Sequence, residues 1–233
     1  HEKPLFEKVG IQTTFVGHPL ANKIPLKSNK FKYRKMLKLK SKELVIALLP
    51  GSRMGELKAH TDTLLETAQN LLEVHPDAKF LIPATNDKNV HFIKGRIRNN
   101  PTKNLKLIKG KVDEILSSSN IAIAASGTAS LQIALHKKPM IIIYKGSWIS
   151  YFIWKMVRLI PNVSLPNILL NENFVPEMLQ HRATPNLLSE KACKIINDKK
   201  YLKKIEFKFN RLHKDLKKNT SSLIFKIIKP YLK

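Results

Sequence analysis

Short apolar runs alternate with helical patterns between residues 43 and 144. The runs end close to a proline, glycine or serine, which is typical of strands buried on both faces of a parallel sheet. The expected strands are 43–49, 79–83, 105–108, 120–125 and 139–144, and the expected helices are 60–74, 88–99, 112–118 and 128–137. Strands that alternate with helices predict βαβ units, so we expect an α/β fold with a doubly wound parallel sheet.

Three segments depart from this rhythm. Residues 1–42 end in a basic stretch (27–42) that is either a loop or a helix, and we expect them to form a junction before the α/β domain at 43–182. Residues 183–233 predict a basic helical tail, because apolar side chains recur there at helical spacing. These side chains are Leu202, Ile205, Phe209, Leu212 and Leu216.

Residues 148–160 are dense in aromatic and long apolar side chains. One interpretation is a helix buried against the sheet. The other is a face that touches lipid, with Trp148, Tyr151 and Trp154 at the level of the headgroups.

The charge is strongly basic, with 42 Lys and Arg against 17 Asp and Glu and a net charge of +25. Arginine is the better reader of bases and phosphates, yet only 7 of these residues are arginine, so a nucleic-acid partner is not expected. A compositional drift of the surface, an anionic membrane or a phosphorylated substrate remain open. A single cysteine, Cys193, excludes a disulfide framework. No apolar run of about 18 residues occurs, so we expect no membrane-spanning helix.

Two loops follow predicted strands and carry small or hydroxyl residues. Pro50-Gly51-Ser52-Arg53 is either a turn with a surface arginine or a phosphate site, because Gly51 permits close backbone approach and Arg53 binds phosphate bidentately. We call it loop 50–53.

Ser126-Gly127-Thr128-Ala129-Ser130, which we call loop 126–130, follows the strand at 120–125. Ser126 or Thr128 is either a simple helix N-cap or part of a nucleotide cradle. Ligands of open α/β sheets bind beyond the carboxyl ends of the strands, so the two loops together favour a nucleotide. Neither GxxxxGK[ST] nor GxGxxG occurs.

Ser164-Leu165-Pro166-Asn167 is a polar interruption in an apolar run. Asn167 either caps a turn or serves a site, since its amide offers a donor and an acceptor. The histidines are scattered without metal-ligand spacing, and we expect them to be structural or exposed.

Eight sequence blocks occur in a characteristic order. They are 14–20, 48–53 with Glu56, 124–131, 139–140, 144–145, 163–169, 175–177 and 179–180. In this order they resemble the bacterial lipid-A-disaccharide synthases over residues 2–182, whereas the resemblance is faint in the tail.

The resemblance implies an inverting glycosyltransferase of the GT-B type. Such enzymes join UDP-2,3-diacylglucosamine to 2,3-diacylglucosamine 1-phosphate, which gives the β-1,6-linked lipid A disaccharide 1-phosphate and UDP. No metal or other cofactor is expected. The resemblance also implies a peripheral location on the inner face of the bacterial cytoplasmic membrane, and a homodimer formed through the C-terminal tail.

The resemblance assigns roles to residues of both loops. Gly51, Ser52, Arg53, Ser126, Gly127, Thr128 and Gln132 are expected to bind the UDP of the donor. Arg53 and Asn167 are the catalytic candidates, with Arg53 stabilising the charge that develops on UDP.

Two departures from the family pattern affect these expectations. The family usually has Glu at the position of Gln132, where a carboxylate grips the ribose hydroxyls, and Gln lacks that charge-assisted strength. The resemblance also begins near the junction of the two GT-B halves. We therefore expect this chain to carry the donor site without the N-terminal carboxylate that acts as general base, and not to turn over alone.

Three alternatives stay open. A non-catalytic remnant of the same fold would not bind UDP. A basic RNA-associated protein would bind nucleic acid with a steep salt dependence. Another GT-B transferase that uses a UDP-sugar would show no preference for acylated donors.

Overall fold

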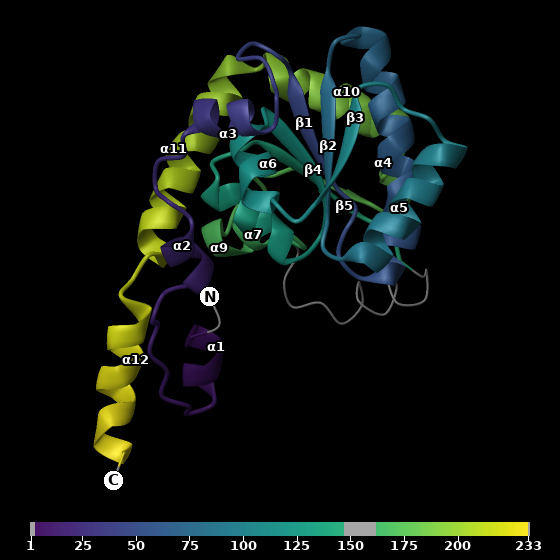
Figure 1. Cartoon of the computed structure of the whole chain (residues 1–233). Coiled ribbons are helices and arrows are strands. Elements are labelled where there is room, and N and C mark those ends of the chain that lie inside the picture. Colours follow the sequence, from purple (N-terminus) through teal and green to yellow (C-terminus); the bar gives the residue numbers. More distant parts are fainter. Residues whose placement is uncertain (1–2, 147–161, 233) are drawn as a thin grey trace.

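The computed structural model describes residues 3–146 and 162–232, and within them the chain forms one parallel sheet. The strand order is β3-β2-β1-β4-β5-β6, and every neighbouring pair is parallel. The strands are β1 (Val45–Leu49), β2 (Lys79–Ala84), β3 (Leu105–Lys109), β4 (Ile121–Ala125), β5 (Met140–Tyr144) and β6 (Glu177–Leu179). The doubly wound α/β fold predicted from the sequence is confirmed (Figure 1).

The predicted strands and helices are found within a few residues of their expected bounds. The helices of the α/β unit are α4 (Met54–Val74), α5 (Asp87–Asn99), α6 (Val112–Ser118) and α7 (Thr128–Leu135). Helix α4 begins six residues before the expected start at 60, because the Glu56 carboxylate accepts hydrogen bonds from two amides at its N-terminus. Helix α7 ends before the expected 137 because Lys137 is left-handed, with φ 57°. The short edge strand β6 was not predicted.

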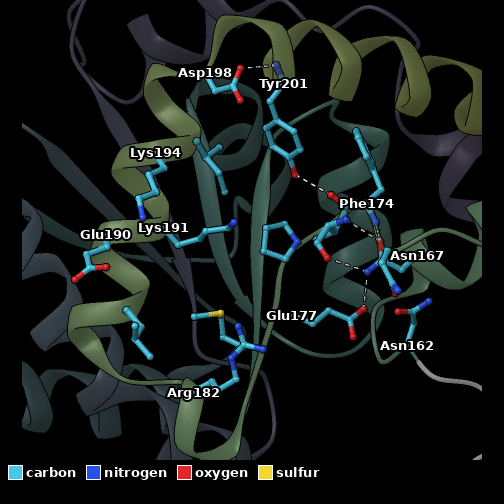
Figure 2. Close-up of a pocket in the computed structure, with 16 residues that line it drawn as sticks. Asn162, Asn167, Phe174, Glu177, Arg182, Glu190, Lys191, Lys194, Asp198 and Tyr201 are labelled. Carbon is cyan, nitrogen blue, oxygen red and sulfur yellow. Dashed lines mark hydrogen bonds between the residues drawn. The ribbon is translucent and has the colours of Figure 1, made fainter.

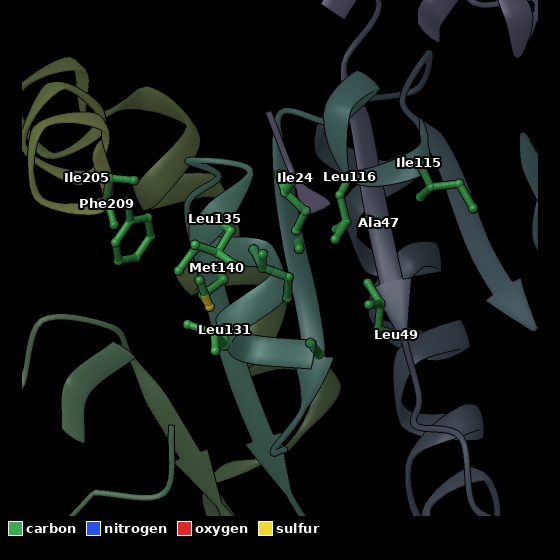
Figure 3. Packing of buried hydrophobic residues seen from close by; sticks show 14 of the residues in the cluster. Ile24, Ala47, Leu49, Ile115, Leu116, Leu131, Leu135, Met140, Ile205 and Phe209 are labelled. Atoms are coloured by element: carbon green, nitrogen blue, oxygen red, sulfur yellow. The ribbon is translucent and has the colours of Figure 1, made fainter. Parts of the chain in front are cut away.

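Helices cover both faces of the sheet. Helices α4, α5 and α10 (Pro185–Asn197) pack on one face, where Ile46 and Leu48 of β1 point. Helices α6, α7 and α11 (Lys199–Leu216) pack on the other, where Ala47 and Leu49 point. Figure 3 shows Ile205 and Phe209 of α11 packed in this second core. Alternate residues of β1 thus serve two cores, which is why its sequence is apolar throughout.

The predicted helical tail divides into two parts. Helices α10 and α11 place apolar side chains in the two cores, so residue 183 does not mark a boundary in the packing. Helix α12 (Thr220–Ile228), followed by the 3₁₀ turn η2 (Lys229–Tyr231), buries no residue. It extends away from the α/β body, as Figure 1 shows.

The N-terminal segment forms short helices. They are α1 (Lys3–Lys8), α2 (Pro19–Lys23) and α3 (Lys30–Met36). Of these, α2 and α3 pack against the body. Gly17 has φ 86°, and a side chain there would overlap the Leu216 carbonyl, which accepts from the His18 amide at 2.9 Å. Buried Arg34 of α3 donates to the carbonyls of Lys40, Ser41 and Ser118 and to Asn120.

Beyond β5, the described chain resumes at residue 162. Helix α9 (Leu165–Leu170) precedes β6, and the 3₁₀ turn η1 (Gln180–Arg182) follows it. The aromatic segment at 148–160, with Trp148, Tyr151 and Trp154, lies outside the described residues. Among the helices that are described, none has the length and apolar character needed to cross a bilayer.

Candidate functional site

The chain reverses its direction of winding between β1 and β4. Strands β2 and β3 lie on one side of β1, and strands β4, β5 and β6 lie on the other. At such a switch point the loops after the two central strands diverge and leave a crevice at the carboxyl edge of the sheet. A cavity of about 330 Å³ occupies this place. Both candidate loops line it, together with Glu56, Pro83, Thr85, Val112 and Gln132.

Loop 50–53 and Glu56 of α4 bring a glycine, an acid and an exposed guanidinium to the cavity. Gly51 has φ 114°, and a side chain at this position would overlap Glu56. The Glu56 carboxylate accepts from the amides of Ser52 at 2.8 Å and Arg53 at 3.2 Å. Two amides of this loop are therefore already used. The Arg53 guanidinium lies 3.8 Å from the Glu56 carboxylate. Because the Arg53 side chain is nevertheless 88% exposed, its guanidinium remains accessible to a ligand.

Loop 126–130 has a different geometry. Gly127, with φ 146°, is the N-cap of α7, so the N-cap role expected for Ser126 or Thr128 falls to neither of them. The Ser126 hydroxyl instead donates to the carbonyl of Val163 at 2.9 Å. No acceptor among the described residues reaches the amides of Thr128 and Ala129. These amides point along the positive end of the helix dipole, which suits an anion.

A buried histidine fixes loop 50–53 to the end of β5. His60 of α4 contacts the Pro50 carbonyl through Nδ1 at 3.2 Å, and its Nε2 accepts from the Lys145 amide at 3.0 Å. Burial lowers the pKa of His60, so the ring is neutral and Nδ1 carries the proton. The expectation of a structural histidine is confirmed here.

Gln132 lies on the wall of the cavity and contacts an acid that the sequence did not single out. Its amide nitrogen donates to Asp113 Oδ1 at 2.7 Å, and His136 Nε2 lies 3.1 Å from the same oxygen. These contacts, the His136 hydrogen bond foremost, lower the pKa of Asp113 to about 2. The sequence does hold a signal for this contact. Gln132 and His136 are four residues apart, as are Asp113 and Ser117, and residues four apart share a helix face.

Asn167 lies elsewhere, beside the edge strand β6. It lines a second cavity of about 640 Å³ between β6, α9, α10 and α11 (Figure 2). Its amide nitrogen donates to the carbonyl of Val175 and to Glu177, and its oxygen accepts from the amides of Phe174 and Val175. All four hydrogen-bonding positions of this buried amide are used within the protein. The structure therefore gives Asn167 a positioning contact, and its catalytic role stays a prediction.

Glu177 completes this second network. Its carboxylate accepts from the amides of Val163 and Ser164, from the Ser164 hydroxyl at 2.7 Å, and from Asn167 at 2.8 Å. Blocks 163–169 and 175–177 of the sequence thus bind each other. Among the described residues, no group of three His, Cys, Asp or Glu side chains is arranged to hold a metal ion.

The chain is similar to curated bacterial proteins. It is 38% identical to lipid-A-disaccharide synthase of Aromatoleum aromaticum over 99% of this chain and 60% of the relative. With lipid-A-disaccharide synthase of Dechloromonas aromatica the identity is 39%, over 94% of this chain and 58% of the relative. The chain therefore spans about 60% of the length of these relatives.

A solved structure shares the fold at low sequence identity. The C-terminal domain of a group 1 family glycosyl transferase from Francisella tularensis has a TM-score of 0.57 and 15% identity. The match covers 87% of this chain and 100% of that domain. At this identity the likeness shows the fold alone. A family model for lipid-A-disaccharide synthetase matches residues 1–228, and the chain accordingly belongs to the lipid-A-disaccharide synthetase family.

Proposed function

We propose that this chain binds the UDP of UDP-2,3-diacylglucosamine in the cavity between loop 50–53 and loop 126–130. The observation that carries the proposal is the convergence of both loops, with Gln132, on one cavity at the β1–β4 switch point. Nucleotides bind at such switch points in open α/β sheets. Family membership supports UDP-2,3-diacylglucosamine as the donor.

In the whole enzyme, we propose, the acceptor is 2,3-diacylglucosamine 1-phosphate. Its 6-hydroxyl oxygen forms a bond to C1 of the donor sugar while the bond from C1 to the UDP oxygen breaks. The electron pair leaves with UDP, and a base removes the hydroxyl proton. We assign that base to the N-terminal half of the family's fold and propose that no metal takes part.

The residues of the cavity would act on the leaving diphosphate. The Arg53 guanidinium is exposed at the cavity and would neutralise charge on the phosphate oxygens. The amides of Thr128 and Ala129 would donate to the same anion from the first turn of α7. These groups stabilise the transition state more than the ground state, because charge accumulates on UDP as the bond breaks.

Two further proposals concern partners. We propose that α12 pairs with a second copy of the chain, which is supported by its four exposed apolar residues Ile224, Phe225, Ile227 and Ile228. We also propose peripheral binding to the inner face of the cytoplasmic membrane, supported by the net charge of +25 and by exposed Phe31 and Phe207. A chain that ends at Lys218 should sediment as a monomer and still pellet with anionic vesicles.

Calorimetric titration of UDP into the purified chain tests the donor site. The wild-type chain should show saturable binding. Arg53→Ala should weaken UDP binding about 10- to 100-fold and leave the free energy of unfolding unchanged, since the side chain is exposed. The effect should be larger for UDP than for uridine, which lacks the diphosphate. Arg98→Ala, at an exposed position of α5, is the matched control.

Each alternative predicts a different result. Absence of heat from a folded wild-type chain would overturn the donor site and favour a remnant of the fold. Equal UDP affinity in Arg53→Ala and Arg98→Ala would remove loop 50–53 from the site. Equal binding of acylated and unacylated UDP-sugars by the whole enzyme would favour a different UDP-sugar transferase.

A further inference from the structure

Helices α6 and α7 face each other through four polar side chains. Asp113 and Ser117 lie one turn apart on α6, and Gln132 and His136 lie one turn apart on α7. Gln132 donates to Asp113 at 2.7 Å, and His136 lies 3.1 Å from both Asp113 Oδ1 and the Ser117 hydroxyl. The His136 side chain is 2% exposed, so solvent does not reach this end of the hydrogen-bond network.

The Asp113 carboxylate decides which way the Gln132 amide points. With a pKa of about 2, Asp113 is ionised at neutral pH and offers only acceptors. The group of Gln132 that faces it must therefore be the NH₂ group. The carbonyl oxygen Oε1 then points away from Asp113, and no donor among residues 3–146 and 162–232 reaches it.

The outward oxygen belongs to a side chain on the wall of the cavity. Gln132 lines the cavity between the two loops, as does Val112, the neighbour of Asp113. An amide that donates to a carboxylate becomes a stronger acceptor at its oxygen, because hydrogen bonds in a chain polarise one another. Lys23 of α2 lies 3.6 Å from the second Asp113 oxygen and helps to hold the carboxylate in place.

We infer that Asp113 is a positioning residue for the nucleotide site, which turns Gln132 Oε1 toward the cavity to accept a hydrogen bond from a ribose hydroxyl of the donor. The inference rests on the proposed UDP site and deepens it. Gln132 carries no charge of its own, but its amide nitrogen is hydrogen-bonded to the negatively charged Asp113 carboxylate. The two residues act as one acceptor unit.

Replacing the Gln132 amide with a carboxylate should then weaken the hydrogen bond to the ribose in this chain. Gln132→Glu would place a second carboxylate within hydrogen-bond distance of ionised Asp113, and the two charges would repel each other. The paired variant Asp113→Asn/Gln132→Glu reverses the roles. The amide introduced on α6 would donate to the carboxylate introduced on α7, which keeps a free acceptor oxygen for the ribose.

The test compares UDP with 2′-deoxy-UDP and 3′-deoxy-UDP by calorimetry on the full 233-residue chain. The wild-type chain should prefer UDP over at least one deoxy analogue by about 5- to 20-fold, the usual value of one hydrogen bond to a charged or polarised group. Asp113→Ala should lose most of this preference. Gln132→Glu should also lose it, and Asp113→Asn/Gln132→Glu should regain it. Asp62→Asn, which breaks the ion pair of α4 with Arg96, is the control.

The ratio of affinities separates positioning from general destabilisation, because a partly unfolded variant loses both ligands alike. A wild-type preference that survives in Asp113→Ala overturns the inference and leaves the donor site intact. Tighter UDP binding by Gln132→Glu than by the wild-type chain also overturns it. If Asp113→Ala does not fold, the two Gln132 variants decide. If the folded wild-type chain binds no UDP, the proposed site and this inference fall together.

Discussion

Motif residues line two cavities of the described structure and use their hydrogen-bonding groups in opposite ways. At the β1–β4 edge, Arg53 and the first amides of α7 are left without strong partners within the described structure. Beside β6, Asn167 and Glu177 bind each other, and the surrounding backbone amides and carbonyls complete their hydrogen bonds. The motif residues of the first cavity therefore keep hydrogen-bonding capacity for a ligand, whereas Asn167 and Glu177 of the second use theirs within the fold.

The difference teaches that a polar motif residue is not by itself a ligand-binding residue. The larger cavity is the one beside β6, yet its motif side chains are committed to the protein. The smaller cavity lies at the switch point and presents a guanidinium and helix amides. Hydrogen-bonding capacity left at the motif residues, rather than cavity size, therefore distinguishes the candidate site.

Of the substitutions that test this difference between the cavities, Glu177→Ala should produce the largest loss of stability. The substitution removes an acceptor of four hydrogen bonds and leaves the amides of Val163 and Ser164 without it. We expect the free energy of unfolding to fall by about 3–5 kcal/mol, since buried donors without acceptors are costly. UDP affinity, measured well below the melting temperature, should change less than twofold. Chemical denaturation and calorimetry on the same preparation measure both quantities.

Asn167→Ala is the natural companion, and it also tests the catalytic candidate. A positioning role predicts a loss of stability of about 2–4 kcal/mol, and non-additivity with Glu177→Ala, because the two side chains share one network. A catalytic role predicts the reverse, with normal stability and a large fall in kcat of the whole enzyme. Unchanged stability in both variants would show that the hydrogen bonds of Asn167 and Glu177 do not stabilise this region.

Much of the fold could be predicted because its signals are local. Strands β1, β4 and β5 are continuous apolar runs, β2 is apolar after Lys79, and the apolar residues of β3 are interrupted by Lys106. The helices between the strands repeat apolar residues at helical spacing. Strand β6 is only three residues long and includes Glu177, so no apolar run announces it. It forms because β5 offers an open edge, which is a tertiary cause.

The candidate site could be predicted only in part. The two loops were found because glycine and small hydroxyl residues directly after a buried strand let a ligand approach the backbone, and the structure places both loops on one cavity. Asp113 and His60 were not assigned to it. Their importance depends on which residue of a neighbouring helix or loop they face, and a single sequence does not contain that pairing.

The smallest expected effect concerns the histidine that fixes loop 50–53. The pKa of buried His60 is lowered, so between that pKa and about 6.5 the unfolded chain binds the proton more readily than the folded one. This contribution to stability is present above about pH 6.5 and is lost as the pH falls. Burial also lowers the pKa of His18 and His213, so the wild-type slope is shared among these groups.

His60→Gln isolates its share of that slope. Between pH 7 and pH 5 the free energy of unfolding should fall further for the wild-type chain than for the variant. The loss should be local, because protonated His60 can no longer accept from the Lys145 amide, whereas no histidine lines the cavity beside β6. Hydrogen exchange, corrected for the intrinsic pH dependence, should therefore rise at loop 50–53 and residue 145 and stay constant over 163–177. A parallel rise in both regions would show that acid loosens the whole sheet edge, and that the two cavities do not differ in the way their hydrogen bonds imply.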